Sequence, residues 1–352
     1  MFRLIFLTIL GVYIGTNAYI ARMLCRWLGL SGMVAACWYV GFTLVAGGYF
    51  LSSMAPAGLR KGMALIGGWY MGAYVLLVAA VPLCHLLLRS KNGPLSAGIL
   101  LVAALVYVLV GIYTASHIRI TSYTVESGRS TPVKIALISD LHAGDIIGAG
   151  KIGEMVERIN AIDADIVLVA GDLFDVAGPK AVPDLEAVGE ALRGIRSKQG
   201  VYAVFGNHDA GFDHQDAYAQ QLMEDWGMTV LRDEAVELED MVIIGRRDAH
   251  EPRKTVEELM AGIDRSKTVI LMDHQPSQLI EGAAAGVDLM VCGHTHGGQV
   301  FPANLITGRM FKLDYGILRE DGFTAVVSSG AGTWGPRMRV ATVSEVVEIT
   351  LK

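Results

Sequence analysis

Hydrophobic residues follow two different patterns along this chain of 352 residues. The first third contains long apolar runs that are separated by short segments with charged or turn-forming residues. The four runs are Leu4–Leu24, Met33–Leu51, Met63–Leu88 and Ala97–Ala115. About 20 apolar residues in a helix cross a hydrocarbon core of about 30 Å, so each run predicts a membrane-spanning helix. We expect residues 1–116 to form a transmembrane region of four helices.

From residue 133 onward, short runs rich in β-branched residues alternate with helix-like stretches. The strand-like runs are Lys134–Ile138, Ile166–Ala170, Val201–Phe205, Val269–Met272 and Leu289–Cys292. The helix-like stretches are Ile152–Ile162, Leu185–Ile195, Gln215–Trp226 and Thr255–Ile263. Strands that alternate with helices predict an α/β domain, which we place at residues 133–352. Residues 117–132 are polar and lack helical periodicity, and we interpret them as a linker.

Charge separates the same two regions. No Asp or Glu precedes Glu126, and eight basic residues lie in the first 121 positions. The other 21 basic residues are opposed by all 35 acidic ones, so the rest of the chain has a formal net charge of −14. This acidity disfavours nucleic acid as a partner, because phosphate backbones attract basic surfaces. The middle of each apolar run lacks charged side chains, which favours an anchor or lipid-facing platform over an ion-coupled transporter.

The arrangement of the spans relative to the membrane follows from their flanking charges. A cleaved signal peptide is an alternative for the first run, because Arg3 precedes it. However, Thr16-Asn17-Ala18 is a poor cleavage site and three further runs follow. Four spans place both ends of the region on one side, where six basic residues flank them, against four on the other side. The positive-inside rule therefore favours a multi-pass protein of the cell (inner) membrane with residues 133–352 in the cytoplasm.

Each strand-like run ends in residues of the types that bind metal ions. The motifs are Asp140-Leu141-His142, Gly171-Asp172-Leu173-Phe174-Asp175, Gly206-Asn207-His208-Asp209, Asp273-His274 and Gly293-His294-Thr295-His296. One such motif alone is weak, because Asn and Asp are common in turns. All five in order, each at the carboxyl end of a strand where α/β domains bind ligands, indicate a site. Imidazole, carboxylate and amide donors suit Mn²⁺, Fe²⁺ or Zn²⁺ better than Ca²⁺.

This mixture of donors also suits two ions, because one carboxylate can bridge both. Two metals about 3.5–4 Å apart can hold a hydroxide between them and support an in-line displacement at phosphorus. A histidine beside two cations needs a nearby carboxylate to remain a useful acid. For His208 the candidates are Asp175 and Asp209. The alternative for Asp209 is a helix-capping role for the stretch after Gly211.

The complete set of motifs resembles the calcineurin-like metallophosphoesterase superfamily over about residues 134–351. The resemblance implies an α/β fold: a four-layer α-β-β-α metallophosphoesterase sandwich, here preceded by the four-helix transmembrane region. It implies two divalent metal ions, Mn²⁺ first, with Fe²⁺ or Zn²⁺ as alternatives. The first ion would be held by Asp140, His142 and His296, the second by Asn207, His274 and His294, with Asp172 bridging both. His208 would act as general acid or stabilise the phosphoryl charge, oriented by Asp175 or Asp209.

Other segments indicate which branch of the superfamily the chain resembles. In the protein Ser/Thr phosphatases of this superfamily, Arg-Gly follows the last Asp of the second motif. Here Val176-Ala177 follow Asp175, which disfavours that branch. Residues 297–299 and 328–339 are instead similar to a bacterial branch of membrane-attached phosphodiesterases of the YkuE and YaeI type, although four spans depart from the single anchor of many members.

Two groups of residues near the motifs suggest substrate contacts. Apolar residues follow the last motif, and a loop of this kind, with Leu305 and Phe311, would suit an acyl chain. The alternative is that these side chains pack on the sheet. Arg337 and Arg339 could pair with a substrate phosphate, and their alternative role is surface solubility.

We therefore expect a membrane-anchored, metal-dependent hydrolase of phosphoester, phosphodiester or pyrophosphate bonds that uses a metal-bridging hydroxide. The expected partners are the lipid bilayer and a lipid-phosphate substrate, with no nucleic acid; the sequence does not define the oligomeric state. One alternative is a phosphodiesterase for a soluble substrate that is only tethered to the membrane. The other is a non-catalytic metal-binding sensor or scaffold, which has no need of a general acid such as His208.

Overall fold

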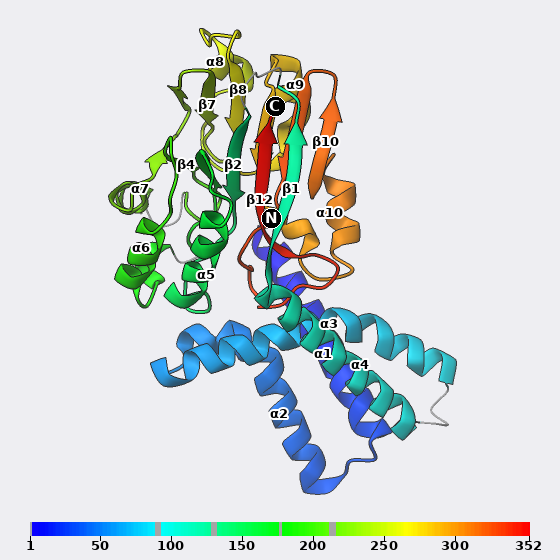
Figure 1. The fold of residues 1–352 in the computed structure, drawn as a ribbon. Coiled ribbons are helices and arrows are strands. Elements are labelled where there is room, and N and C mark those ends of the chain that lie inside the picture. The colour runs from blue at the N-terminus through cyan, green and yellow to red at the C-terminus, as the bar shows by residue number, and fades with distance from the viewer. Residues whose placement is uncertain (1, 89–92, 128–131, 176–177, 211–215) are drawn as a thin grey trace. The chain divides into compact units, whose positions relative to one another are not determined.

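The computed structural model describes residues 2–88, 93–127, 132–175, 178–210 and 216–352, and the chain divides into two compact units (Figure 1). The first unit contains the residues up to Tyr113 together with Gly335–Met338. The second unit contains Thr114–Trp334 and Arg339–Lys352. Each unit has its own hydrophobic core, so each is described by itself.

The first unit is built from four long apolar helices. They are α1 (Phe2–Trp27), α2 (Gly32–Leu51), α3 (Ala57–Leu88) and α4 (Gly93–Ser116), with a short 3-10 helix η1 (Ser52–Met54) after α2. All four are long and apolar enough to cross a membrane, which confirms the predicted helices. Side chains such as Ile20, Leu24 and Val81 form a small buried core, while many large apolar side chains along the helices remain exposed. Exposed apolar residues on every helix are expected where lipid is the solvent.

The second unit contains two six-stranded mixed sheets. The first sheet has the order β1-β12-β2-β3-β4-β5. Its strands are β1 (Ile118–Val125), β12 (Ser344–Leu351), β2 (Val133–Ile138), β3 (Ile166–Ala170), β4 (Val201–Val204) and β5 (Thr229–Val230). Strands β2 to β5 are parallel, and β12 is antiparallel to β2. The carboxyl ends of β2, β3 and β4, where three of the predicted motifs begin, therefore meet at one edge.

The second sheet has the order β10-β11-β9-β8-β7-β6. Its strands are β10 (Gly316–Glu320), β11 (Phe323–Val327), β9 (Leu289–Cys292), β8 (Thr268–Met272), β7 (Met241–Gly245) and β6 (Glu234–Glu237). The four central strands, β11, β9, β8 and β7, are parallel, and an antiparallel strand closes each side. Strands β8 and β9 end in the other two predicted motifs, so those motifs also lie side by side.

The sheets pack face to face with helices on their outer faces, as the two-residue period of the strands requires. In β2, Ala136 and Ile138 face the helices, whereas Ile135 and Leu137 face the other sheet. Helices α5 (Ala149–Asn160), α6 (Leu185–Arg193) and α7 (Asp216–Asp225) cover the first sheet, and α8 (Val256–Met260) and α9 (Leu279–Ala285) cover the second (Figure 1). This is the expected four-layer α-β-β-α sandwich. The remaining elements are α10 (Asn304–Met310) and the 3-10 helices η2 (Pro179–Ala181), η3 (Pro276–Gln278) and η4 (His296–Gly298).

The segment interpreted as a linker contains a strand. Residues 118–125 form β1, which pairs in parallel with β12 over eight positions at the edge of the first sheet. Its side chains are largely exposed between a buried Ile118 and a buried Val125, which explains why no hydrophobic alternation marked it. The described part of the linker is therefore mostly part of the sandwich, and residues 128–131 lie outside the described residues.

Candidate metal centre and active site

The loops after β2, β3, β4, β8 and β9 bring their polar residues together between the two sheets. Within the residues that the structure describes, three groups of side chains have ligand atoms within 4.8 Å of one another. They are Asp140, His142 and His296; His142, Asp172 and His208; and Asp172, His274 and His294. The groups share members, so they form one continuous cluster with the donor types of a two-metal site.

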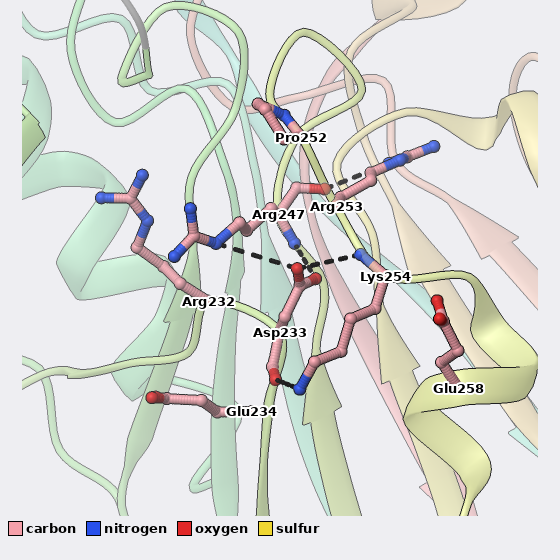
Figure 2. Close-up of a pocket in the computed structure, with 8 residues that line it drawn as sticks. All are labelled: Arg232, Asp233, Glu234, Arg247, Pro252, Arg253, Lys254 and Glu258. Carbon is pink, nitrogen blue, oxygen red and sulfur yellow. Dashed lines mark hydrogen bonds and ion pairs between the residues drawn. The ribbon is translucent and has the colours of Figure 1, made fainter.

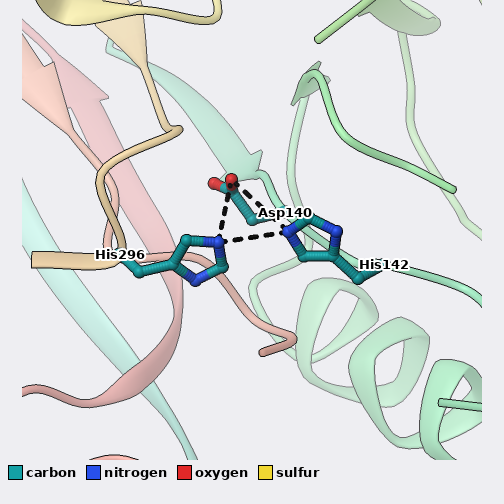
Figure 3. A group of neighbouring side chains, drawn as sticks. All are labelled: Asp140, His142 and His296. Carbon is teal, nitrogen blue, oxygen red and sulfur yellow. Dashed lines mark hydrogen bonds and ion pairs between the residues drawn. The ribbon is translucent and has the colours of Figure 1, made fainter. Parts of the chain in front are cut away.

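Asp140, His142 and His296 form the first group, and their side chains point toward one another (Figure 3). The Nε2 atoms of His142 and His296 are 3.1 Å apart. Asp140 Oδ1 lies 3.4 Å from the Nε2 of His296 and 4.0 Å from that of His142. All three side chains are buried, so the group offers one carboxylate and two imidazoles to a single small cation.

Asp172 occupies the centre of the cluster. Its Oδ2 lies 3.2 Å from His274 Nε2 and 3.9 Å from both His142 Nε2 and His208 Nε2. Its Oδ1 accepts a hydrogen bond from the backbone N–H of His208 at 2.8 Å. Among the described residues, Asp172 alone belongs both to a group with His142 and to a group with His274 and His294. This position fits a carboxylate that bridges two ions.

Asn207 supplies an observation that favours a second ion beside His274 and His294. Its side-chain oxygen is buried and has no hydrogen-bond partner within the part of the chain that the structure describes. A buried amide oxygen without a partner is costly in a folded protein, and a metal ion would satisfy it. The donors of Asp140, His142 and His296 thus fit one ion and those of His274 and His294 a second, with Asp172 in both neighbourhoods. Asn207 as a ligand of the second ion stays a prediction, which its buried and unpartnered oxygen supports.

The backbone at the cluster is held in an uncommon conformation. Asp140, His142, Asp172, His294 and His296 all have positive φ, between 50° and 73°. A non-glycine residue in this left-handed region costs of the order of 1 kcal/mol or more. Five such residues in one cluster indicate that the surrounding loops force these side chains inward.

Electrostatics keep most of the imidazoles in the form that a ligand requires. Burial lowers the pKa of His142 to about 3 and that of His294 to about 4, so both are neutral at physiological pH. For His274, burial acts to lower the pKa, but the charges of Asp172 and Asp140 outweigh it and raise the pKa well above its ordinary value. The raised pKa favours a proton on His274, and a cation bound between these carboxylates would replace that proton.

The carboxylate of Asp209 binds backbone groups of two loops and has a structural role. It was predicted to orient His208 or to cap the following helix. Instead its buried carboxylate accepts hydrogen bonds from the backbone N–H groups of Leu173, Phe174 and Gly206, at 3.0–3.2 Å. Burial, followed by the charge of Asp172, raises its pKa to about 7. Asp209 therefore ties the loop after β3 to the loop after β4.

Arg339 also differs from its predicted role. The side chain is fully buried, so its guanidinium is not available to a phosphate in the way that the sequence suggested. Nη2 donates to the carbonyl oxygens of Ser329 and Gly332 at 2.6 and 2.8 Å, and lies 3.1 Å from Nδ1 of His296. Nη1 donates to the carbonyl oxygen of His296 at 3.2 Å. Arg339 therefore holds His296 and the 329–332 loop in place. Arg337 lies in the segment that groups with the first unit, and its predicted contact with phosphate stays a prediction.

His208 lies at the border of the cluster, as a proton donor to substrate would. Its side chain is 11% exposed, and its ring is 5.0 Å from that of His142 and 6.2 Å from that of Trp334, between centroids. Its Nδ1 has no hydrogen-bond partner among the described residues. Asp175 is directed toward His142, with Oδ1 4.0 Å from Nδ1 of that ring. Neither predicted carboxylate thus contacts Nδ1 of His208.

Of the predicted apolar residues, Phe311 lies near the second ligand group. The ring of Phe311 is 6.3 Å from that of His294 in an edge-to-face arrangement. Leu305 lies on α10 and is half exposed. Ile306 and Met310 lie on the same helix and are more exposed than Leu305. These side chains therefore do not simply pack on the sheet.

The sequence interpretation missed the residues that follow β7. Asp248 is fully buried and its Oδ1 lies 2.8 Å from Nδ1 of His250, while Gln275, next to His274, donates to both of its oxygens. Asp273, at the start of the same motif as His274, is contacted by Arg246 and Arg253 at 3.1–3.4 Å. A polar loop after an apolar strand was the available signal, but β7 itself was not recognised.

Two sheets between layers of helices, with carboxylate and imidazole ligands at facing strand ends, define the class of two-metal phosphoesterases. The chain belongs to the calcineurin-like phosphoesterase family. The family profile matches residues 133–298. A metallophosphoesterase from Aquifex aeolicus is 31% identical over 70% of this chain and 97% of its own length.

Other relatives extend beyond the matched region. A metallophosphoesterase from Helicobacter pylori is 30% identical over 62% of this chain, and the match spans 60% of that relative. A "transmembrane protein with metallophosphoesterase domain" from Danio rerio is 29% identical over 62% of this chain and 53% of its own length. The chain thus spans between about half and nearly all of the length of these relatives.

Proposed function

We propose that the protein is a membrane-anchored hydrolase of phosphoester, phosphodiester or pyrophosphate bonds in a lipid-linked substrate. The observation that supports hydrolysis most strongly is the central position of Asp172 between two ligand groups, with His208 beside it. Two bound divalent ions, which we propose to be Mn²⁺, would polarise the phosphoryl group and activate the attacking water.

The residues of the chain divide the remaining work. The two ligand groups would orient the phosphoryl group between them, since an in-line attack requires fixed geometry. His208 would donate a proton to the leaving oxygen as the P–O bond breaks, or stabilise the phosphoryl charge. Asp209 and Arg339 hold the ligand loops in place, which a scaffold without catalysis would also need. His208, partly exposed beside Asp172, is placed where a proton donor to a substrate would lie.

The lipid-linked substrate is supported by the apolar surface beside the ligands. Phe311 contacts the ring of His294, and Phe301, Leu305, Ile306 and Met310 are 44–69% exposed. Trp334, half exposed, lies against His208, and Gln299 holds its backbone through two hydrogen bonds of 2.8 and 2.9 Å. Large exposed apolar side chains next to a polar site are typical of contact with an acyl chain. The cytoplasmic placement and the YkuE and YaeI branch remain part of the same proposal.

Generic hydrolysis tests this proposal. The full chain in detergent with Mn²⁺ should hydrolyse bis(p-nitrophenyl) phosphate, and Asp172→Ala and His208→Ala should each abolish the activity. Metal content measured by mass spectrometry should fall only in Asp172→Ala. Full activity in either variant refutes its assigned role, and loss of metal in His208→Ala would make His208 a ligand.

The substrate class has its own test. The double variant Leu305→Ser, Phe311→Ser should raise the KM for a phospholipid-type diester in mixed micelles about tenfold or more, from the loss of two apolar contacts. The KM for bis(p-nitrophenyl) phosphate should stay within twofold. An equal change for both substrates would favour the alternative of a soluble substrate.

A further inference from the structure

Residues 246–254 form a basic loop on an acidic unit, at the same edge of the sheet as the metal ligands. Strand β7 is parallel to β8, and β8 to β9, so the loop after β7 emerges beside His274 and His294. The loop contains three arginines and one lysine against two acidic residues. Carboxylates of the protein pair with the arginines of the loop: Asp273 lies 3.4 Å from Arg246 and 3.1 Å from Arg253, and Asp233 lies 3.8 Å from Arg247. A ligand here would therefore meet the polar groups that these pairs leave exposed.

Asp248 and His250 form an oriented pair within this loop. Nδ1 of His250 lies 2.8 Å from Oδ1 of Asp248, and the backbone N–H of His250 donates to the same oxygen at 2.9 Å. A carboxylate only accepts, so Nδ1 carries a proton and Nε2 lies on the opposite side of the ring. The side chain of His250 is 66% exposed, whereas that of Asp248 is fully buried. The buried group therefore orients an imidazole that is presented to solvent.

The pair is connected directly to the second ligand group. Gln275, which follows His274, donates from Nε2 to both oxygens of Asp248 at 3.1 and 3.0 Å. The negative charge of Asp248 also acts on both His274 and His294. Asp248 therefore fixes the exposed ring of His250. Gln275, the residue after His274, in turn holds Asp248 in place.

The loop itself is anchored, as Figure 2 shows for the cavity beside it. The carboxylate of Asp233 accepts from the backbone N–H groups of Arg247 and Lys254, both at 3.0 Å. The Arg247 guanidinium lies 3.8 Å from the same carboxylate, and Arg253 donates to the carbonyl oxygen of Arg247 at 3.1 Å. These cations are engaged with the protein, so the cavity in Figure 2 is less suited to a ligand than the exposed ring of His250.

We propose that His250 binds a second phosphate of the substrate, beyond the phosphorus that reacts, and that the substrate is therefore a diphosphate. This rests on the proposed function and deepens it. Because Nδ1 of His250 is engaged by Asp248, Nε2 is the ring nitrogen that is left to hydrogen-bond with the phosphate. Asp248 acts as a positioning residue, and neither residue is a metal ligand.

Binding measurements test this without requiring turnover. Isothermal titration of the Mn²⁺-loaded full chain with adenosine 5′-(α,β-methylene)diphosphate and with AMP compares two ligands that differ in one phosphate. The wild type should bind the diphosphate more tightly. His250→Gln should weaken diphosphate binding about tenfold or more, the loss of one hydrogen bond to a charged group, and leave AMP binding within twofold. Asp248→Asn should also weaken diphosphate binding, but by a smaller factor.

The matched control is His117→Gln, the same substitution at an exposed position just before β1. It should change neither affinity. Equal affinity of the wild type for both ligands, or an equal loss of both in His250→Gln, overturns the proposal. Failure to hydrolyse bis(p-nitrophenyl) phosphate would overturn the proposed function alone, because the binding experiment stands independently of it.

Discussion

Replacing Arg339 by lysine tests whether a buried guanidinium holds the metal centre together. The six acceptors within 2.6–3.2 Å of its Nη atoms include the backbone oxygens of Ser329, Gly330, Gly332 and His296. Lysine offers three donors from a single point, so at least half of these acceptors lose their partner. Each buried unpaired group costs about 1–3 kcal/mol, and with partial relaxation we expect about 3–5 kcal/mol in total.

For a unit of this size that destabilisation lowers the Tm by roughly 10 °C, at about 2–4 °C per kcal/mol. Because Arg339 also positions His296, metal affinity should fall about 10- to 100-fold. Thermal unfolding of the detergent-solubilised chain and a Mn²⁺ titration measure the two effects. Arg193→Lys, at an exposed position on α6, is the control and should change the stability by less than about 0.5 kcal/mol. Wild-type Tm and metal affinity in Arg339→Lys would refute the assigned role.

Three further changes probe the supports of the site. Gly206→Ala would place Cβ 2.6 Å from the backbone nitrogen of Asp172 and against its carboxylate, so activity should fall about 100-fold, whereas Gly153→Ala, with open space around it, should keep full activity. Asp209→Asn offers one acceptor where three N–H groups now donate, and it should lower the free energy of unfolding by about 2–3 kcal/mol in chemical denaturation. Asp184→Asn, an equally good helix cap, is its control and should be neutral; equal losses would contradict the difference in burial. Chelation of bound metal should lower the Tm, and added Mn²⁺ should restore it. If the free ion was at 100 times its Kd, its removal lowers the free energy of unfolding by about 2.7 kcal/mol. An unchanged Tm would argue against metal binding to the native state.

The clustering of the motif residues and the central strands were predictable because they depend on local sequence. Strands β3 and β9 begin and end where the runs of β-branched residues predicted, and His142, Asp172 and His294 lie within the four residues that follow such runs. Short loops after parallel strands have little choice of direction, so the cluster follows from the strand order.

The parts that were not predictable depend on contacts between distant segments. Strand β1 is an exposed edge strand that pairs with β12, more than 200 residues away, and its sequence has no clear apolar face. Arg339 could be assigned to a phosphate or to the interior only once its burial was known. The hydrogen bonds from Gln275 that hold Asp248 come from another loop.

In the proposed function, Asp172 would bridge two ions that the chain binds for hydrolysis. The most direct measurement is the number of Mn²⁺ ions bound per chain, taken together with the hydrolysis of bis(p-nitrophenyl) phosphate, in the wild type and in Asp172→Asn. We expect two ions and measurable hydrolysis in the wild type, and fewer than two ions with no hydrolysis in the variant. Two ions and unchanged hydrolysis in Asp172→Asn, or a wild type that binds none, would contradict it.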